Sequence, residues 1–182
     1  EFLLNSLKTY LIEQDDFKHL MDGLSSGMNE QLISGLTHSL RVMLVSLLFE
    51  SAKRPVLLVT HELSQAQKLY EELSALSTEE DVYLYPVNEW FATELTTSSP
   101  ELKAQRLDVW NRWNKKKTGI IIAPIAALKR ALPPKDLMEQ FEMTVQVGEE
   151  YDYETFVSRL VEFGYNYSEM VSTPGEMSRR GG

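Results

Sequence analysis

The chain contains an unbroken apolar run at residues 55–60, PVLLVT, and a second one at residues 119–123, GIIIA. Short apolar runs bounded by turn residues are typical of parallel strands that are covered on both faces. Between the two runs lie a helical pattern over residues 62–76 and a shorter strand pattern over residues 82–85. Strands that alternate with helices predict an α/β fold, with a mostly parallel sheet flanked by helices and right-handed crossovers.

The neighbouring patterns extend this layer on both sides. Residues 39–54 are apolar on almost every side of a helix, which is typical of a buried helix. A further helix is expected to begin with Ser99 as its N-cap and Pro100 in its first turn. Residues 31–36 predict a short strand, and residues 125–132 a short helix. The inward side chains of the helix after Pro100 are expected to be Leu102, Leu107, Trp110 and Trp113.

We expect three parts along the chain, namely N-terminal helices (1–30), an α/β domain (31–140) and the truncated beginning of a small α+β second domain (141–182). The boundary before the third part is expected near Pro133-Pro134. In the third part, residues 143–147 predict a strand and residues 152–163 a helix that stops at Gly164. Residues 165–171 are expected to open a further sheet.

Composition excludes several classes of function. The 182 residues carry 18 basic and 27 acidic side chains, a net charge of −9, which argues against a dedicated binder of polyanions. The absence of Cys excludes disulfide scaffolds, thiol nucleophiles and thiolate metal sites. His19, His38 and His61 are too scattered for a histidine metal cage, so no metal site is expected. No apolar run approaches the roughly 20 residues that a bilayer needs, and no signal peptide is visible, so we expect a cytoplasmic protein without a membrane partner.

Residues 35–42, GLTHSLRV, lie where a nucleotide-binding α/β domain carries its phosphate loop. A working loop reads GxxxxGK[ST], because glycines let the backbone surround the phosphates, Lys neutralises them and a hydroxyl binds magnesium. Here Gly35 is present, but Leu40, Arg41 and Val42 replace the second glycine, the lysine and the hydroxyl. None of the apolar strands ends in the carboxylate pair that a motor needs. We therefore expect no bound cofactor and no catalytic residues in this chain, and the alternative is an ATPase or helicase core.

Two surface features could bind a macromolecule. Lys115–Lys117 follow Trp110 and Trp113 by about one helical turn, and such a cluster can bind nucleic acid, so direct DNA binding is a further alternative. A solvated turn explains the lysines better, since the Trp side chains are expected to face the core and basic residues suit the C-terminal end of a helix. Residues 85–91, YPVNEWF, place aromatic side chains after a strand, either for packing or for docking.

Arg179 and Arg180 form a basic pair near the end of the sequence. The planar guanidinium group donates two parallel hydrogen bonds to a carboxylate, and Arg is enriched in protein interfaces. The pair is therefore a candidate for partner binding, although an ordinary exposed pair has the same appearance.

The ordered set of motifs resembles the N-terminal part of the bacterial transcription-repair coupling factors. The motifs are the degenerate loop at 35–42, PVLLVT (55–60), AQKL (66–69), YP and EW (85–90), SP and RL (99–107), IIIAP (120–124), GY (164–165), and GE and RG (175–181). The resemblance implies a helicase-like first domain that has lost its nucleotide site. It also implies a second domain, beginning near Phe141, that binds UvrA, a component of the nucleotide excision nuclease (the excinuclease).

The resemblance further implies roles for particular residues and partners. The Arg of the Arg-Gly step contacts UvrA in this family, which assigns Arg180 to partner binding, whereas Arg179 is a candidate from the chemistry of the basic pair alone. Residues 86–99 are too few for the DNA-clamping hairpin of the related damage-recognition component of the excinuclease. The parent protein is expected to remove stalled RNA polymerase from damaged DNA with ATP and magnesium, and other domains of the parent would bind polymerase, DNA and nucleotide.

Overall fold

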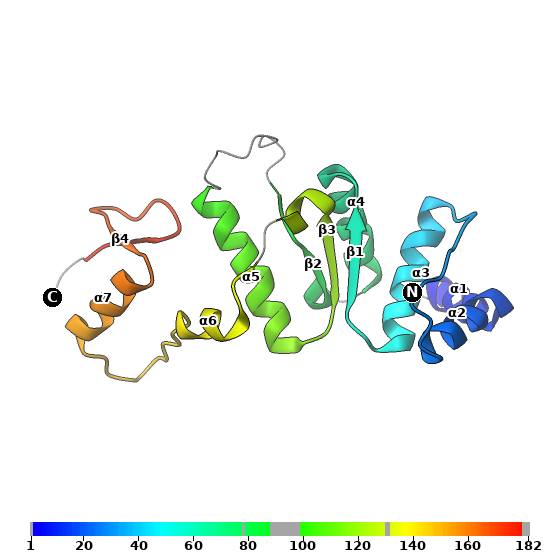
Figure 1. Cartoon of the computed structure of the whole chain (residues 1–182), viewed down its shortest axis with the longest axis horizontal. Helices are drawn as coiled ribbons and strands as arrows, with labels where there is room; N and C mark the ends of the chain where they lie inside the picture. The colour runs from blue at the N-terminus through cyan, green and yellow to red at the C-terminus, as the bar shows by residue number, and fades with distance from the viewer. Residues whose placement is uncertain (1, 78, 88–98, 130–131, 180–182) are drawn as a thin grey trace.

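A computed structural model describes residues 2–77, 79–87, 99–129 and 132–179. These residues contain a parallel sheet of three strands, in the order β1-β3-β2, and a two-stranded parallel pair near the C-terminal end. The strands of the larger sheet are β1 (Val56–Thr60), β2 (Val82–Leu84) and β3 (Ile120–Pro124), joined by helices as in Figure 1. The prediction of an α/β fold with a small, mostly parallel sheet flanked by helices is confirmed.

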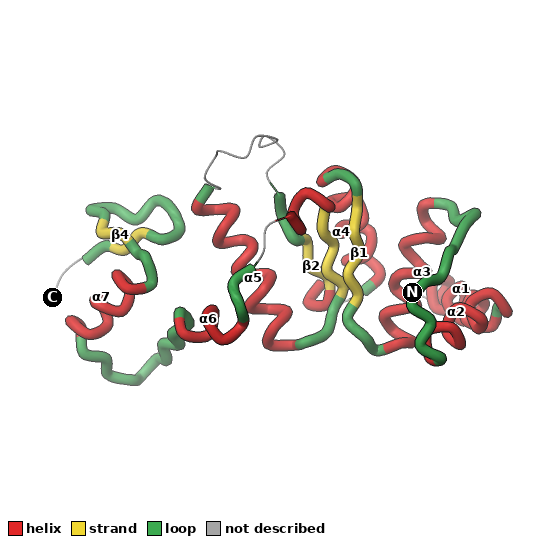
Figure 2. Tube along the Cα trace, in the orientation of Figure 1, coloured by secondary structure: helices red, strands yellow, loops and turns green. Residues whose placement is uncertain are grey.

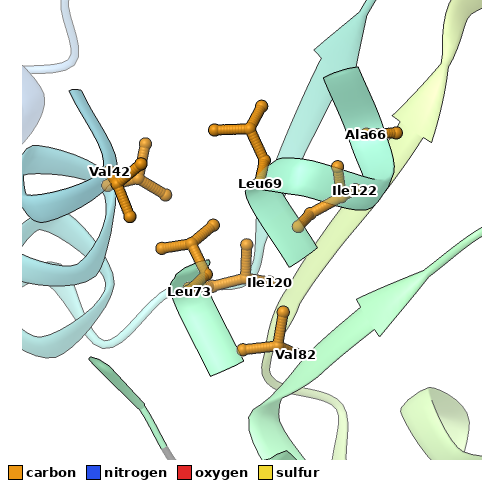
Figure 3. Close-up of a cluster of buried hydrophobic side chains, with 8 residues drawn as sticks. Val42, Ala66, Leu69, Leu73, Val82, Ile120 and Ile122 are labelled. Carbon is orange, nitrogen blue, oxygen red and sulfur yellow. The ribbon is translucent and has the colours of Figure 1, made fainter. Parts of the chain in front are cut away.

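One face of the sheet carries the main core. Helices α3 (His38–Ala52) and α4 (Leu63–Leu76) cover this face, and Leu73 and Ile120 are fully buried there. Figure 3 shows side chains of α3, α4 and the strands pointing toward one another. The buried members of this cluster are Val42, Val45, Ala66, Leu69, Leu73, Val82, Ile120 and Ile122. Because successive strand residues point to opposite faces, alternate residues of β2 and β3, among them Tyr83 and Ala123, belong to a second buried cluster on the other face.

Helix α5 (Pro100–Lys116) lies beside β2 on the second face. Ser99 caps it as predicted, since its hydroxyl oxygen accepts a hydrogen bond from the Leu102 amide at 3.2 Å, and Pro100 occupies the first turn. Val109 is buried against this face. The expectation that Leu107 points inward is wrong, because it lies about 200° around the helix from Val109 and is 44% exposed.

Strand β1 differs from its prediction in one respect. Its apolar run predicts an interior strand, but within the described residues β1 is an edge of the sheet. On the α5 face Leu57 is 55% and Val59 45% exposed, because α5 lies against β2 at the other side of the sheet. The opposite residues, Val56 and Leu58, pack against the main core.

Two short helices, α1 (Phe2–Glu13) and α2 (Asp15–Ser25), pack against α3 at the N-terminal end. The predicted strand at residues 31–36 is wrong. This segment has irregular backbone, Gly35 has a φ of +79°, and the side chain of Gln31 reaches back to the Leu20 carbonyl of α2. A strand needs a partner for its backbone groups, and none of the described strands lies beside this segment.

The short helix expected at 125–132 is the 3₁₀-helix η2 (Ile125–Lys129), and η1 (Glu79–Asp81) precedes β2. After α6 (Lys135–Gln140), residues 142–152 form the irregular connection visible in Figure 2. The predicted strand at residues 143–147 is therefore wrong, and since no described strand pairs with it, Val147 stays fully exposed.

The last part of the described chain is a helix with a small parallel pair of strands. These elements are α7 (Tyr153–Glu162), β4 (Asn166–Tyr167) and β5 (Glu176–Met177). The predicted helix and its stop at Gly164 are confirmed, since Gly164 has a φ of +89° that favours glycine. Of the helices that the structure describes, none is long and apolar enough to cross a membrane.

Candidate functional site

The first candidate is the N-terminal end of α3, where residues 35–42 replace a phosphate loop. Thr37 is the N-cap, and its hydroxyl oxygen accepts from the Leu40 amide at 3.4 Å. The Thr37 carbonyl accepts from the Arg41 amide at 3.0 Å. Amide groups at a helix start bind phosphate only when the chain leaves them free. The hydroxyl of Thr37 already occupies one of those donors.

The side chains at the three altered positions point to different places. Val42 is 3% exposed and belongs to the main core, so it faces away from any ligand at the helix start. Leu40 is half-buried and lines a cavity of about 580 Å³ beside α2, together with Leu44 and Leu47. Arg41 is exposed. The structure therefore does not gather these residues around one point.

A carboxylate lies beside the start of α3. Oε2 of Glu72, on α4, is 2.7 Å from Nε2 of His38, the first residue of α3. A carboxylate satisfies the positive end of the helix dipole and repels a second anion in the same place. The sequence does not reveal this pair, because its members are 34 residues apart.

The second candidate is the C-terminal unit that carries the arginine pair. Arg179 is exposed, and its guanidinium carbon lies 4.7 Å from the centre of the Tyr153 ring, at the start of α7. No ion pair involves Arg179 among the residues that the structure describes, so its N–H groups are available to a carboxylate. Arg180, the other predicted partner-binding residue, lies outside the described residues.

Helix α7 has a strong N-terminal cap next to Tyr153. A carboxylate oxygen of Asp152 accepts from the Thr155 amide at 2.9 Å and from the Thr155 hydroxyl at 2.6 Å. These two hydrogen bonds hold the pKa of the Asp152 carboxyl below its usual value. The cap fixes the first turn of α7 and thereby the tyrosine on which Arg179 rests.

The basic cluster Lys115–Lys117 forms the C-terminal end of α5, and part of it makes contacts inside the fold. Lys116 donates to the Glu80 carbonyl at 3.1 Å and lies 3.0 Å from a Glu80 carboxylate oxygen and 3.4 Å from Asp81. The hydrogen bond to Glu80 is the main reason that the pKa of Lys116 is raised. Lys117 is the C-cap of α5 in the left-handed conformation, with a φ of 54°. These contacts fit the structural interpretation of the cluster better than a DNA-binding one.

The first residue of the aromatic stretch 85–91, Tyr85, packs inside the fold. Tyr85 is buried, and Arg106 lies over its ring and donates to the Pro86 carbonyl at 3.0 Å. Residues 88–91 lie outside the described residues, so their predicted docking role stays a prediction. A groove of about 920 Å³ runs between α4 and α5 along β2, and Arg112 lies over the Tyr83 ring within it.

The described residues contain no group of three or more acidic or histidine side chains that could hold a metal ion. His61 follows β1 as predicted, and its Nδ1 is 3.6 Å from Glu62, but both side chains are largely exposed. An exposed histidine with one weakly held carboxylate lacks the partners that orient a catalytic base.

No protein-family model matches the chain. The transcription-repair-coupling factor of Bacillus subtilis (strain 168) is 45% identical over 179 residues, which cover 98% of this chain and 15% of that relative. The protein of the same name from Staphylococcus aureus (strain USA300) is 33% identical over 178 residues, or 97% of this chain and 15% of the relative. The homologues of this chain are transcription-repair-coupling factors.

The expected resemblance to the coupling factors is thereby confirmed. The chain spans about 15% of the length of the curated coupling factors that it matches. Two contacts of the candidate sites were not predicted from sequence, namely Glu72 beside α3 and Tyr153 beneath Arg179. Both depend on how distant segments pack, and no local pattern indicates them.

Proposed function

We propose that this chain is a docking module of transcription-coupled DNA repair. Its partner would be the UvrA component of the excinuclease, which the module would bring to a stalled RNA polymerase. The observation that carries the proposal is the 45% identity, over 98% of the chain, to a protein named as a transcription-repair-coupling factor. Contacts with RNA polymerase and DNA, and ATP-dependent translocation, are proposed for other domains of the parent protein.

In the proposed mechanism, the folded N-terminal part of the chain holds a charged surface in place, and the partner binds to that surface. The core between α3, α4 and the sheet would hold the domain of residues 31–140, with the helices of residues 1–30 packed against it. Residues 141–182 would form the beginning of the docking domain and carry Arg179 and Arg180. Arginines at an interface pair with carboxylates of the partner, and removal of one member of a buried pair typically costs roughly 2–5 kcal/mol.

The proposal is tested by co-purification of tagged chain with purified UvrA. The chain should retain UvrA at physiological salt. If UvrA elutes with the unbound fraction under conditions in which the chain remains folded, the proposed partner is wrong. RNA polymerase core enzyme serves as a comparison, because its proposed binding domain is elsewhere in the parent protein.

We also propose that the chain performs no nucleotide turnover. The buried side chain of Val42, the Thr37 cap and the carboxylate of Glu72 support this proposal. Equilibrium dialysis with ATP and magnesium should give no saturable binding up to millimolar nucleotide. Micromolar binding that weakens when Arg41 is changed to Ala would instead support the alternative of an ATPase core.

A further inference from the structure

The loop between β4 and β5, which precedes Arg179 in the chain, has its two ends joined by backbone hydrogen bonds. Between β4 and β5, residues 168–175 leave the sheet and return to it. The strand pair holds both ends, since the Asn166 amide donates to the Gly175 carbonyl at 2.9 Å and the Ser168 amide donates to the Met177 carbonyl at 2.8 Å. Two backbone bonds alone leave the middle of such a loop free to move.

The carboxylate of Glu176 restrains the middle of this loop. Its Oε2 accepts from the Ser172 amide at 2.8 Å, the Thr173 amide at 3.1 Å and the Ser172 hydroxyl at 3.1 Å. The two backbone hydrogen bonds are the main reason that the pKa of this carboxyl lies below its usual value. In the described part of the chain no Lys or Arg pairs with Glu176, so its charge is balanced by loop donors alone.

The same loop fixes the path of the chain after β5. The Ser178 hydroxyl donates to the Glu169 carbonyl at 2.9 Å, and the next residue, Arg179, lies over Tyr153. Glu176 thus holds one side of the loop and Ser178 the other, directly before the arginine pair. A charged group that leaves a fixed support loses less conformational freedom on binding than one on a mobile tail.

We infer that Glu176 is a positioning residue of the docking surface: it braces the loop of residues 168–175 so that Arg179 is held over Tyr153, ready for a carboxylate-bearing segment of the partner. This inference rests on the proposed function. Glu176 does not itself contact the partner in this scheme. Its role is to reduce the ordering that binding requires, so its loss should weaken binding without unfolding the chain.

The test compares Glu176→Gln with a matched control, Glu162→Gln, on the exposed C-terminal end of α7. Both variants remove one negative charge from the same unit. For Glu176→Gln we expect amide hydrogen exchange at Ser172 and Thr173 to become at least roughly tenfold faster, because a neutral amide is a weaker acceptor. We expect affinity for UvrA to fall roughly three- to tenfold, and Glu162→Gln to change neither quantity.

A second measurement uses the chain without substitutions, so that its result does not depend on whether Glu176→Gln folds correctly. In an NMR pH titration, the amide resonances of Ser172 and Thr173 should move together, with a midpoint below the usual range of a Glu carboxyl. A midpoint at the usual pKa of a Glu carboxyl, or unchanged amide hydrogen exchange at Ser172 and Thr173 in Glu176→Gln, would show that Glu176 does not hold the loop.

UvrA binding by the unchanged chain and by Glu176→Gln shows whether the proposed function or only the positioning role is wrong. If unchanged chain fails to bind UvrA, the proposed function and the positioning role both fall, even if the exchange data support the brace. If unchanged chain binds and Glu176→Gln binds equally well, the positioning role alone is wrong. A correctly folded Glu176→Gln that exchanges faster and binds more weakly supports both.

Discussion

Leu73→Ala should lower the free energy of unfolding by about 2–5 kcal/mol, the usual range for a fully buried leucine. Leu73 has no exposed surface and lies between α3 and the sheet, in the same buried cluster as Val42, Val82 and Ile120. Truncation would remove apolar contacts and leave a cavity in a core that small movements cannot refill. Chemical denaturation followed by circular dichroism measures the change.

Leu107→Ala is the matched control for this prediction. It is the same substitution in another helix, at a side chain that is 44% exposed and lies on the outer side of α5. Surface substitutions of this kind change stability by about 0.5 kcal/mol or less. Equal losses in the two variants would contradict the location of the core on the α3 and α4 face of the sheet.

Arg180→Glu should weaken the binding of UvrA at least roughly tenfold in the full-length protein, because it would place an anion opposite the carboxylate that we propose on the partner. The assignment of Arg180 comes from the family resemblance. The structure adds that its neighbour Arg179 rests on Tyr153 and has no ion pair within the described ranges. Calorimetric titration with UvrA measures the effect.

Arg54→Glu provides the control for charge. Arg54 is exposed just before β1, far along the sequence from the C-terminal unit, and the substitution changes the net charge by the same amount. A loss confined to Arg180→Glu places the interaction at the C-terminal unit. Equal losses in both variants would show that long-range charge governs binding, and unchanged affinity in both would remove Arg180 from the site.

The central α/β layer follows from patterns within the sequence. Apolar runs predicted β1 and β3, and the Ser-Pro pair before α5 predicted the start of that helix correctly. Periodicity does not say which strand lies at an edge, because that depends on strand order. Leu57 and Val59 therefore look like interior residues in the sequence and are half exposed in the structure.

Two predicted strands failed for a shared physical reason. Residues 31–36 and 143–147 have apolar residues with strand-like spacing, but backbone N–H and C=O groups form a strand only beside a partner. In the first segment, packing of Gln31 against α2 competes with strand formation as well. In the second, a turn with Gly148 at a φ of +93° follows at once.

The candidate sites were predictable only in part. The altered residues of the phosphate loop can be recognised by their spacing, and the arginine pair by its chemistry and family resemblance. The carboxylate of Glu72 beside His38 and the hydrogen bonds of Glu176 to Ser172 and Thr173 come from folding. Glu176 is close in sequence to its partners and belongs to the Gly-Glu step of the family resemblance, but no local pattern indicates which groups its carboxylate contacts.

We propose above all that this chain presents a protein-docking surface that includes Arg179 and Arg180. Titration of purified UvrA into the unchanged chain by calorimetry, without added nucleotide, tests it most directly. Saturable binding that is lost in the double variant Arg179→Glu/Arg180→Glu is the predicted result. Absence of binding by the folded chain, or equal binding by the folded double variant, would contradict the account.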